Sequence, residues 1–225
     1  HCSIHDCTVA SSLVFNMSGS AASGVTIRGC VTFNVANIHF QVAATSGTWI
    51  VDGNLFVRCT DSVATAFLSD VGGTFTNNVM AGAAQQGLVL AEANTLGTYT
   101  GNTSHGNADV GLRFNSTVLN GTISNFVIWR NTSNGMYAAL GMNITFDNVT
   151  WFGNGSPNIA VNHGNSFLFK NCTSNGDTTF ATATGVGGGT NQVHSNFIFE
   201  GCSFGVAGGI KAAHTQDISM AAVGF

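Results

Sequence analysis

The sequence repeats a short pattern every 23 or 24 residues, and this repeat limits the possible folds more than any other feature. When the repeats are aligned on one position, here called the anchor, successive anchors lie 23, 24, 24, 24, 24, 23, 23 and 30 residues apart. The anchors are Cys7, Cys30, Asn54, Asn78, Asn102, Phe126, Val149, Cys172 and Cys202. A fixed period of this length indicates a repeat protein, in which each repeat packs on its neighbours.

The three residues before each anchor follow a constant pattern. The third residue before it is always large and apolar, the second is always polar, and the one directly before it is Gly, Asn or Asp. Alternation of this kind is typical of a strand, and Gly, Asn and Asp tolerate a positive φ. We therefore expect an inward residue, an outward residue and then a sharp bend. A second apolar segment follows in most repeats, at residues 37–40, 87–90, 111–114, 135–138, 158–161 and 209–212.

A parallel β-helix accounts for this pattern better than other repeat architectures. Leucine is too scarce for leucine-rich repeats, and helical repeats have periods of about 33 residues or more. The sequence predicts an all-β, right-handed parallel β-helix solenoid of about nine rungs, with 23–24 residues per rung. Because neighbouring strands lie about 4.8 Å apart, the rod would be roughly 40 Å long. We expect one domain over residues 1–225, as a fragment of a longer chain.

The chain resembles the single-stranded right-handed parallel β-helix family with the pectin-lyase-like fold. That family includes pectate lyases, polygalacturonases and many phage tailspikes. The residues that carry the resemblance most specifically are Asn54, Asn78 and Asn102, which are similar to the family's inward asparagine ladder. The resemblance implies amides that bond from rung to rung, and carbohydrate sites on the outside of the rod. A glycine-rich loop at 181–191, in the long last repeat, would either wall a ligand groove or form a plain flexible loop.

The cysteines fit the inward column rather than a metal site. Cys172 and Cys202 share this column on adjacent rungs, as do Cys7 and Cys30. A separation of about 4.8 Å is compatible with a disulfide, but parallel Cβ vectors favour buried free thiols. None of the six cysteines forms a C-x-x-C pair, so we expect no metal and no cofactor.

Composition excludes some classes of function. Only 7% of the residues are charged and the formal net charge is −4, which does not favour nucleic-acid binding. No apolar run approaches the ~20 residues of a membrane span. With so few charges and no capping helix evident at either end, we expect the rod to associate with copies of itself or to dock on a larger assembly.

One outward column could carry chemistry. Asp61, Gln85 and Asp109 each lie seven residues past an anchor, on consecutive rungs. The two aspartates would be about 9.6 Å apart, near the upper limit for the carboxyl pair of an inverting glycosidase. The candidate substrate-binding residues are Gln85, together with His105 and Arg113, which are close to Asp109 in sequence. The alternative interpretation is a row of solvated turn residues.

Two functions follow from these observations. The first is a non-enzymatic structural or receptor-facing rod of an extracellular or virion appendage, which contacts surface glycans. The second is a polysaccharide-degrading enzyme, such as a phage tailspike depolymerase or a secreted glycanase, that uses Asp61 and Asp109. The first is favoured because the aspartate pairs and the Arg-Ile-Lys motif of polygalacturonases are missing, as is the calcium-binding carboxylate cluster of pectate lyases.

Overall fold

The computed structural model describes most of the chain. The described residues are 2–5, 8–10, 15–19, 24–36, 38–44, 49–60, 64–68, 73–91, 97–115, 119–138, 142–155, 157–161, 165–175, 178–180, 194–205, 210–212 and 215–221. Asp61, Cys7 and the glycine-rich segment 181–191 lie outside them.

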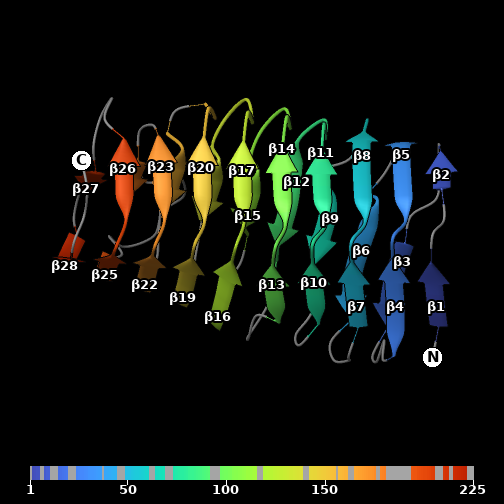
Figure 1. The fold of residues 1–225 in the computed structure, drawn as a ribbon, viewed down its shortest axis with the longest axis horizontal. Coiled ribbons are helices and arrows are strands. Elements are labelled where there is room, and N and C mark those ends of the chain that lie inside the picture. Colours follow the sequence, from blue (N-terminus) through green and yellow to red (C-terminus); the bar gives the residue numbers. More distant parts are fainter. Residues whose placement is uncertain are drawn as a thin grey trace, which may run out of the picture.

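Each turn of the chain contributes one strand to each of three parallel sheets (Figure 1). Sheet A contains β1 (Cys2–His5), β4 (Val25–Arg28), β7 (Trp49–Asp52), β10 (Thr74–Thr76), β13 (Thr98–Thr100), β16 (Leu119–Ser124), β19 (Met142–Asp147), β22 (Asn165–Lys170), β25 (His194–Glu200) and β28 (Thr215–Ala221). Sheet B contains β2 (Thr8–Ala10), β5 (Val31–Val35), β8 (Leu55–Cys59), β11 (Val79–Ala81), β14 (Thr103–His105), β17 (Val127–Trp129), β20 (Thr150–Phe152), β23 (Thr173–Asn175) and β26 (Ser203–Gly205). Sheet C contains β3 (Phe15–Gly19), β6 (Phe40–Ala44), β9 (Ala64–Leu68), β12 (Gln86–Leu90), β15 (Leu112–Phe114), β18 (Met136–Ala138), β21 (Ile159–Val161), β24 (Thr178–Phe180) and β27 (Ile210–Ala212).

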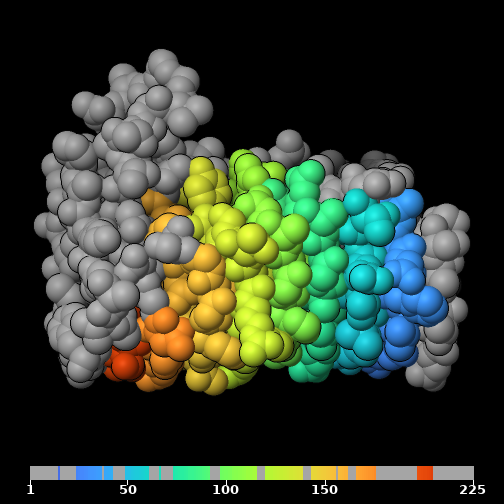
Figure 2. Space-filling model, turned by 90° about the horizontal axis from the view of Figure 1, so that it is seen from above, coloured from blue at the N-terminus to red at the C-terminus, as the bar shows by residue number. Residues whose placement is uncertain are grey.

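Residues that are one repeat apart in the sequence pair with each other in the sheets. Phe75, for example, pairs with Val51 one repeat earlier and with Tyr99 one repeat later. Successive rungs therefore form successive bands along the rod (Figure 2). This confirms the predicted all-β parallel solenoid. The two strands expected from each repeat belong to sheets A and C, and sheet B begins directly after the bend.

The bend between sheets A and B has the predicted backbone conformation. The residue before each anchor has a positive φ, between 50° and 70°, at Gly29, Gly53, Asn77, Gly101, Asn125, Asn148, Asn171 and Gly201. The anchors from Cys30 to Cys202 are buried, as are the large residues three positions before them. The polar residues between those two columns point outward. The inward and outward assignment made from the repeat is therefore confirmed for the described rungs.

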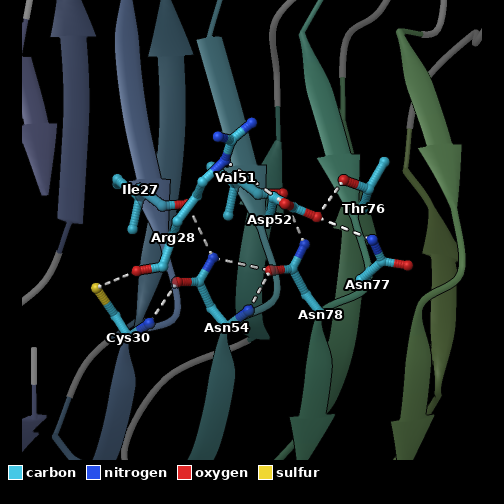
Figure 3. A network of polar contacts seen from close by, with 9 residues as sticks. All are labelled: Ile27, Arg28, Cys30, Val51, Asp52, Asn54, Thr76, Asn77 and Asn78. Carbon is cyan, nitrogen blue, oxygen red and sulfur yellow. Dashed lines mark hydrogen bonds and ion pairs between the residues drawn. The ribbon is translucent and has the colours of Figure 1, made fainter. Parts of the chain in front are cut away.

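The asparagine ladder at the anchors is also confirmed. Asn54, Asn78 and Asn102 are at most 1% exposed. The amide nitrogen of Asn54 donates to Asn78 Oδ1 (2.9 Å), and that of Asn78 donates to Asn102 Oδ1 (3.2 Å). Each Oδ1 also accepts the backbone N–H of the preceding anchor, so Asn78 Oδ1 accepts from Asn54 N at 3.0 Å (Figure 3). The ladder thus satisfies buried polar groups that the turn between two sheets would otherwise leave unpaired.

A second asparagine ladder lines the corner between sheets B and C. Asn107 Nδ2 donates to Asn131 Oδ1 (2.7 Å), and Asn131 Nδ2 donates to Asn154 Oδ1 (2.8 Å). These amides occupy the space beside glycines that open the strands of sheet C. A Cβ on Gly111 would lie 2.5 Å from Asn131 Nδ2, and one on Gly135 would lie 2.7 Å from Asn154 Nδ2. The glycines at these positions are therefore required by the ladder.

The core beneath sheet A is largely a stack of aromatic rings. Phe169 lies between Phe146 and Phe199, with both pairs of ring centroids 5.0 Å apart. Cys172 and Cys202 are buried free thiols beside this stack, as predicted. Cys172 Sγ donates to Lys170 O (3.2 Å) and Cys202 Sγ to Phe169 O (3.3 Å). The hydrogen bond with the Cys202 thiol, together with burial, raises the pKa of Cys172.

One histidine is enclosed in the core. His39 is fully buried, and its Nδ1 lies 2.6 Å from Thr32 Oγ1. Burial lowers the pKa of His39 to about 4, and a hydrogen bond with the Arg58 backbone opposes this with a smaller effect. His39 is therefore neutral in the folded protein near pH 7.

Candidate binding faces

The described members of the predicted carboxylate column, Gln85 and Asp109, lie in the turns between sheets B and C. The backbone N–H of Asp109 donates to Gln85 O (2.8 Å), which places these two residues on adjacent rungs as expected. Gln86, which is 2% exposed, donates from Nε2 to Asp109 Oδ2 (3.3 Å). Asp61 lies outside the described residues, so the proposed carboxyl pair stays a prediction.

Arg113 lies on the outer face of sheet C. Its strand residues on either side, Leu112 and Phe114, are buried in the core, and Arg113 pairs in register with Tyr137 on the next rung. The guanidinium carbon lies 5.5 Å from the centre of the Tyr137 ring, in a cation–π contact. This arrangement leaves a charged and an aromatic side chain side by side, half-buried, on the outside of the rod.

His105 lies on a different face, the outer face of sheet B. Its ring stacks on Trp129 (4.5 Å between centroids, 19° between planes), and Trp129 stacks on Phe152 (5.7 Å, 7°). We call His105, Trp129 and Phe152 the aromatic column. Desolvation by burial lowers the pKa of His105. The structure therefore separates His105 from Arg113, which sequence proximity had grouped in one site.

Arg130 lies against the aromatic column. Its guanidinium carbon lies 5.0 Å from the centre of the Trp129 ring. Arg130 has a positive φ of 51°, and its Cγ lies 3.9 Å from where a Cβ on Gly153 would be. The arginine stem thus lies along the rod over a rung that has no side chain at that position.

Several apolar side chains lie on the outer face of sheet B. Leu55 and Val127 are 37% and 36% exposed. Within the described strands of this sheet, the only Asp, Glu, Lys or Arg is Arg58. Within the described strands, the outer face of sheet B is therefore almost without charge.

The outer face of sheet A carries two ion pairs, together with Asp147, which accepts a hydrogen bond from Asn171 Nδ2 at 3.2 Å. Arg28 Nε lies 3.5 Å from Asp52 Oδ2, and Lys170 Nζ lies 3.6 Å from Glu200 Oε2. Figure 3 shows Asp52 also accepting hydrogen bonds from Thr76 (2.8 Å) and Asn77 (2.9 Å) on the next rung. Exposed pairs of this kind contribute only about 0.2–1 kcal/mol each. Their effect is to order the face rather than to build a catalytic site.

The aromatic column and the second ladder were not predicted, although both leave a signal in the sequence. His105, Trp129 and Phe152 each lie three residues past an anchor, and Asn107, Asn131 and Asn154 each lie five residues past one. Among the residues that the structure describes, no group of three His, Cys, Asp or Glu could hold a metal ion. The same part of the chain contains no helix long and apolar enough to cross a membrane.

Comparison with known proteins agrees with the architecture. Residues 64–221, more than half of the chain, match the family model described as a right-handed beta helix region. No curated protein and no solved structure matched the chain. Three parallel sheets, two inward asparagine ladders and this match lead to one conclusion. The chain belongs to the family of proteins with a right-handed β-helix region.

Proposed function

We propose that this chain is a non-enzymatic structural or receptor-facing rod of the pectin-lyase-like type, part of an extracellular or virion appendage, which contacts surface glycans. The observation that carries the glycan contact is the aromatic column with Arg130 on the outer face of sheet B. Aromatic rings offer large apolar contact area, and indole and imidazole also carry polar atoms at their edges. Binding sites for small molecules commonly combine such rings with a few polar groups.

The described candidates for chemistry do not share one face, which supports a binding role over a catalytic one. His105 lies on sheet B, Arg113 lies on sheet C, and Asp109 lies in the turn between them. Asp109 also accepts a hydrogen bond from the buried Gln86. General acid and base catalysis needs groups that converge on one bond of the substrate.

The test is a binding screen of the fluorescently labelled chain on an array of bacterial and plant polysaccharides. We expect binding to at least one polysaccharide, and we expect Trp129→Ala to weaken it while Tyr137→Ala, an aromatic truncation on sheet C, leaves it unchanged. Circular dichroism of both variants controls for folding. Absence of binding across the array, or equal loss in both variants, would contradict glycan contact through sheet B.

A polysaccharide-degrading enzyme is the second candidate, favoured by the half-buried Arg113 and Tyr137 beside each other on sheet C. The bound polysaccharide should be incubated with the chain and examined for new reducing ends and for unsaturated products. Shortening of the polysaccharide that Asp109→Asn abolishes would overturn the non-enzymatic proposal. If the protein is not an enzyme, the length of the polysaccharide stays constant with the unmodified protein and with Asp109→Asn.

A further inference from the structure

Two arginines lie at one edge of sheet B, in a column where other rungs carry glycine or asparagine. This column is four residues past each anchor, directly after the outward column that contains Trp129. Its backbone has a positive φ, between 51° and 68°, at Asn34, Arg58, Gly82, Gly106, Arg130 and Gly153. We call Arg58 and Arg130 the arginine pair.

Arginine is an unusual residue for this backbone conformation. Glycine and asparagine adopt a positive φ readily, whereas a side chain as large as arginine does so at a cost in free energy. The two rungs between the arginine pair form the same turn with Gly82 and Gly106. The turn itself therefore does not require arginine. Because residues held in a costly backbone conformation cluster at functional sites, the arginine pair points to a role beyond the turn.

The charges of the arginine pair are not neutralised within the described part of the chain. Arg58 and Arg130 are exposed, and neither forms an ion pair there, since the ion pairs of the described residues lie on sheet A. The described carboxylate nearest in the repeat is Asp109, three residues beyond this column, and it accepts a hydrogen bond from Gln86. The arginine pair therefore offers positive charge to a partner outside the chain.

The register of sheet B sets the distance between the two arginines. The residues that precede successive members of the column pair with one another in parallel strands, in the order Val57, Ala81, His105 and Trp129. Neighbouring strands are about 4.8 Å apart, so the arginine pair spans about 14 Å along the rod. Strands β11 and β14, which lie between the two arginines, contain no Asp, Glu, Lys or Arg.

Both arginine stems lie along the rod over a glycine of the next rung. Arg58 Cγ is 3.5 Å from where a Cβ on Gly82 would be, and Arg130 Cγ is 3.9 Å from the equivalent point on Gly153. A Cβ on Gly106, between the two, would have nothing within 4 Å. The edge of sheet B is therefore open between two charged groups that are held in the same way.

We propose that the arginine pair binds the carboxylates of an acidic heteropolysaccharide, in which neutral sugars separate the uronic acids. This inference rests on the proposed glycan-binding rod and names the class of glycan. Guanidinium groups match carboxylates in charge and in geometry, because they can donate two parallel hydrogen bonds. Neutral sugars between the uronic acids would lie against the uncharged strands β11 and β14.

The small number of charges argues against a densely charged polymer. The chain has a formal net charge of −4, so it repels a polyanion at long range. A polymer with an acid on every unit would gain only two cations, about 14 Å apart, against this repulsion. A polymer with widely spaced acids matches the site better, because fewer of its charges remain without a partner.

The test is titration of the chain with polysaccharides, followed by the fluorescence of Trp129. The other two tryptophans, Trp49 and Trp151, are buried in the core, so a change in the signal reports on sheet B. The probes are gellan, whose uronic acids are separated by neutral sugars, polygalacturonate, in which every sugar is acidic, and dextran, which is neutral. We expect gellan to bind most tightly of the three.

Substitution of the arginines tests which residues carry this preference. Arg58→Gln and Arg130→Gln should each weaken gellan binding about two- to fivefold, and the double variant by up to about 25-fold. The matched control is Arg28→Gln, which removes the same charge from sheet A and should leave the affinity for gellan unchanged. Circular dichroism shows whether each variant is folded.

The outcomes separate this proposal from the glycan-binding rod itself. The proposal is overturned if dextran or polygalacturonate binds as tightly as gellan, or if Arg28→Gln weakens binding as much as the arginine-pair variants do. It also fails if none of the three polymers binds. In each of these cases the polysaccharide array with Trp129→Ala still decides independently whether sheet B contacts any glycan.

Discussion

Replacement of Asn78 tests the asparagine ladder at its centre. The Asn78 side chain makes four hydrogen bonds. Its Oδ1 accepts from Asn54 N (3.0 Å) and Asn54 Nδ2 (2.9 Å), while its Nδ2 donates to Val51 O (2.9 Å) and Asn102 Oδ1 (3.2 Å). Asn78→Leu keeps a side chain of similar length but removes every one of these bonds. The backbone N–H of Asn54 then has no acceptor, and it is buried.

The expected loss of unfolding free energy is about 1–3 kcal/mol, the cost of one buried donor left unsatisfied. Asn54 Nδ2 keeps its second acceptor, Ile27 O at 3.1 Å, so it adds less to the loss. The apolar leucine side chain recovers part of the remaining cost by burial. Asn78→Asp should be worse than leucine near neutral pH, because a buried carboxylate would face Val51 O and Asn102 Oδ1, which are both acceptors.

The assay is urea unfolding followed in parallel by circular dichroism and tryptophan fluorescence, since coincident curves justify a two-state treatment. The control is Asn77→Gly, which removes an exposed amide from the adjacent position and keeps the positive φ of 55° easy to adopt. We expect the control to change the unfolding free energy by no more than about 0.5 kcal/mol. An Asn78→Leu protein as stable as the control would refute the ladder's energetic role.

Three further predictions use other described residues. Because burial lowers the pKa of His39 to about 4, below its ordinary 6.5, its contribution to stability is complete above pH 6.5 and is lost as the pH falls towards 4. Urea unfolding should therefore show a free energy of unfolding that is about 2 kcal/mol lower at pH 5 than at pH 7, and this difference should disappear in His39→Gln. An equal difference in both proteins would contradict the prediction. Gly111→Ala should lower the free energy of unfolding by about 1–3 kcal/mol, since its Cβ would lie 2.5 Å from two side-chain atoms of the next rung. A Cβ at Gly106 would have nothing within 4 Å, so Gly106→Asn should have a melting temperature close to that of the unmodified protein. Cys172 and Cys202 should not react with a thiol reagent until urea unfolds the chain, and fast labelling of both in the native protein would show that they are not buried.

The parts of the fold that could be predicted from sequence are those where one residue type serves one geometric need. The bend before each anchor needs a positive φ, which only Gly, Asn and Asp adopt readily, so the column from Gly29 to Gly201 is visible without a structure. The buried column three residues before the anchors is visible for a similar reason. Every rung must fill the same space with a large apolar side chain, such as Phe75 or Tyr99.

Sheet B and the outer faces were harder to predict because their strands follow no single rule. Strand β14 is only three residues long, and its outward residues are Thr103 and His105, which are also common in turns. The pairing of His105 with Trp129 depends on a register that short strands do not reveal by themselves. Sequence proximity placed His105 with Arg113 instead, although a corner of the rod separates the two sheets that carry them.

The hydrogen bonds between asparagines from rung to rung in the two inward ladders run in one direction, which gives each ladder a polarity. In both, each asparagine that has an asparagine on the next rung donates one side-chain N–H to it. The other N–H of Asn54, Asn78 and Asn131 donates back to a backbone carbonyl of the preceding rung. The side-chain oxygens all accept from the preceding rung, so the side-chain carbonyl dipoles align head to tail. At the N-terminal side the first oxygens accept the backbone N–H of Cys30 and of Ala83. Dipoles aligned in this way polarise one another, so a central asparagine strengthens its neighbours on both sides and a terminal one strengthens only one. The two ends of each ladder are therefore electrostatically different, with the side-chain oxygens directed towards the N-terminal rungs.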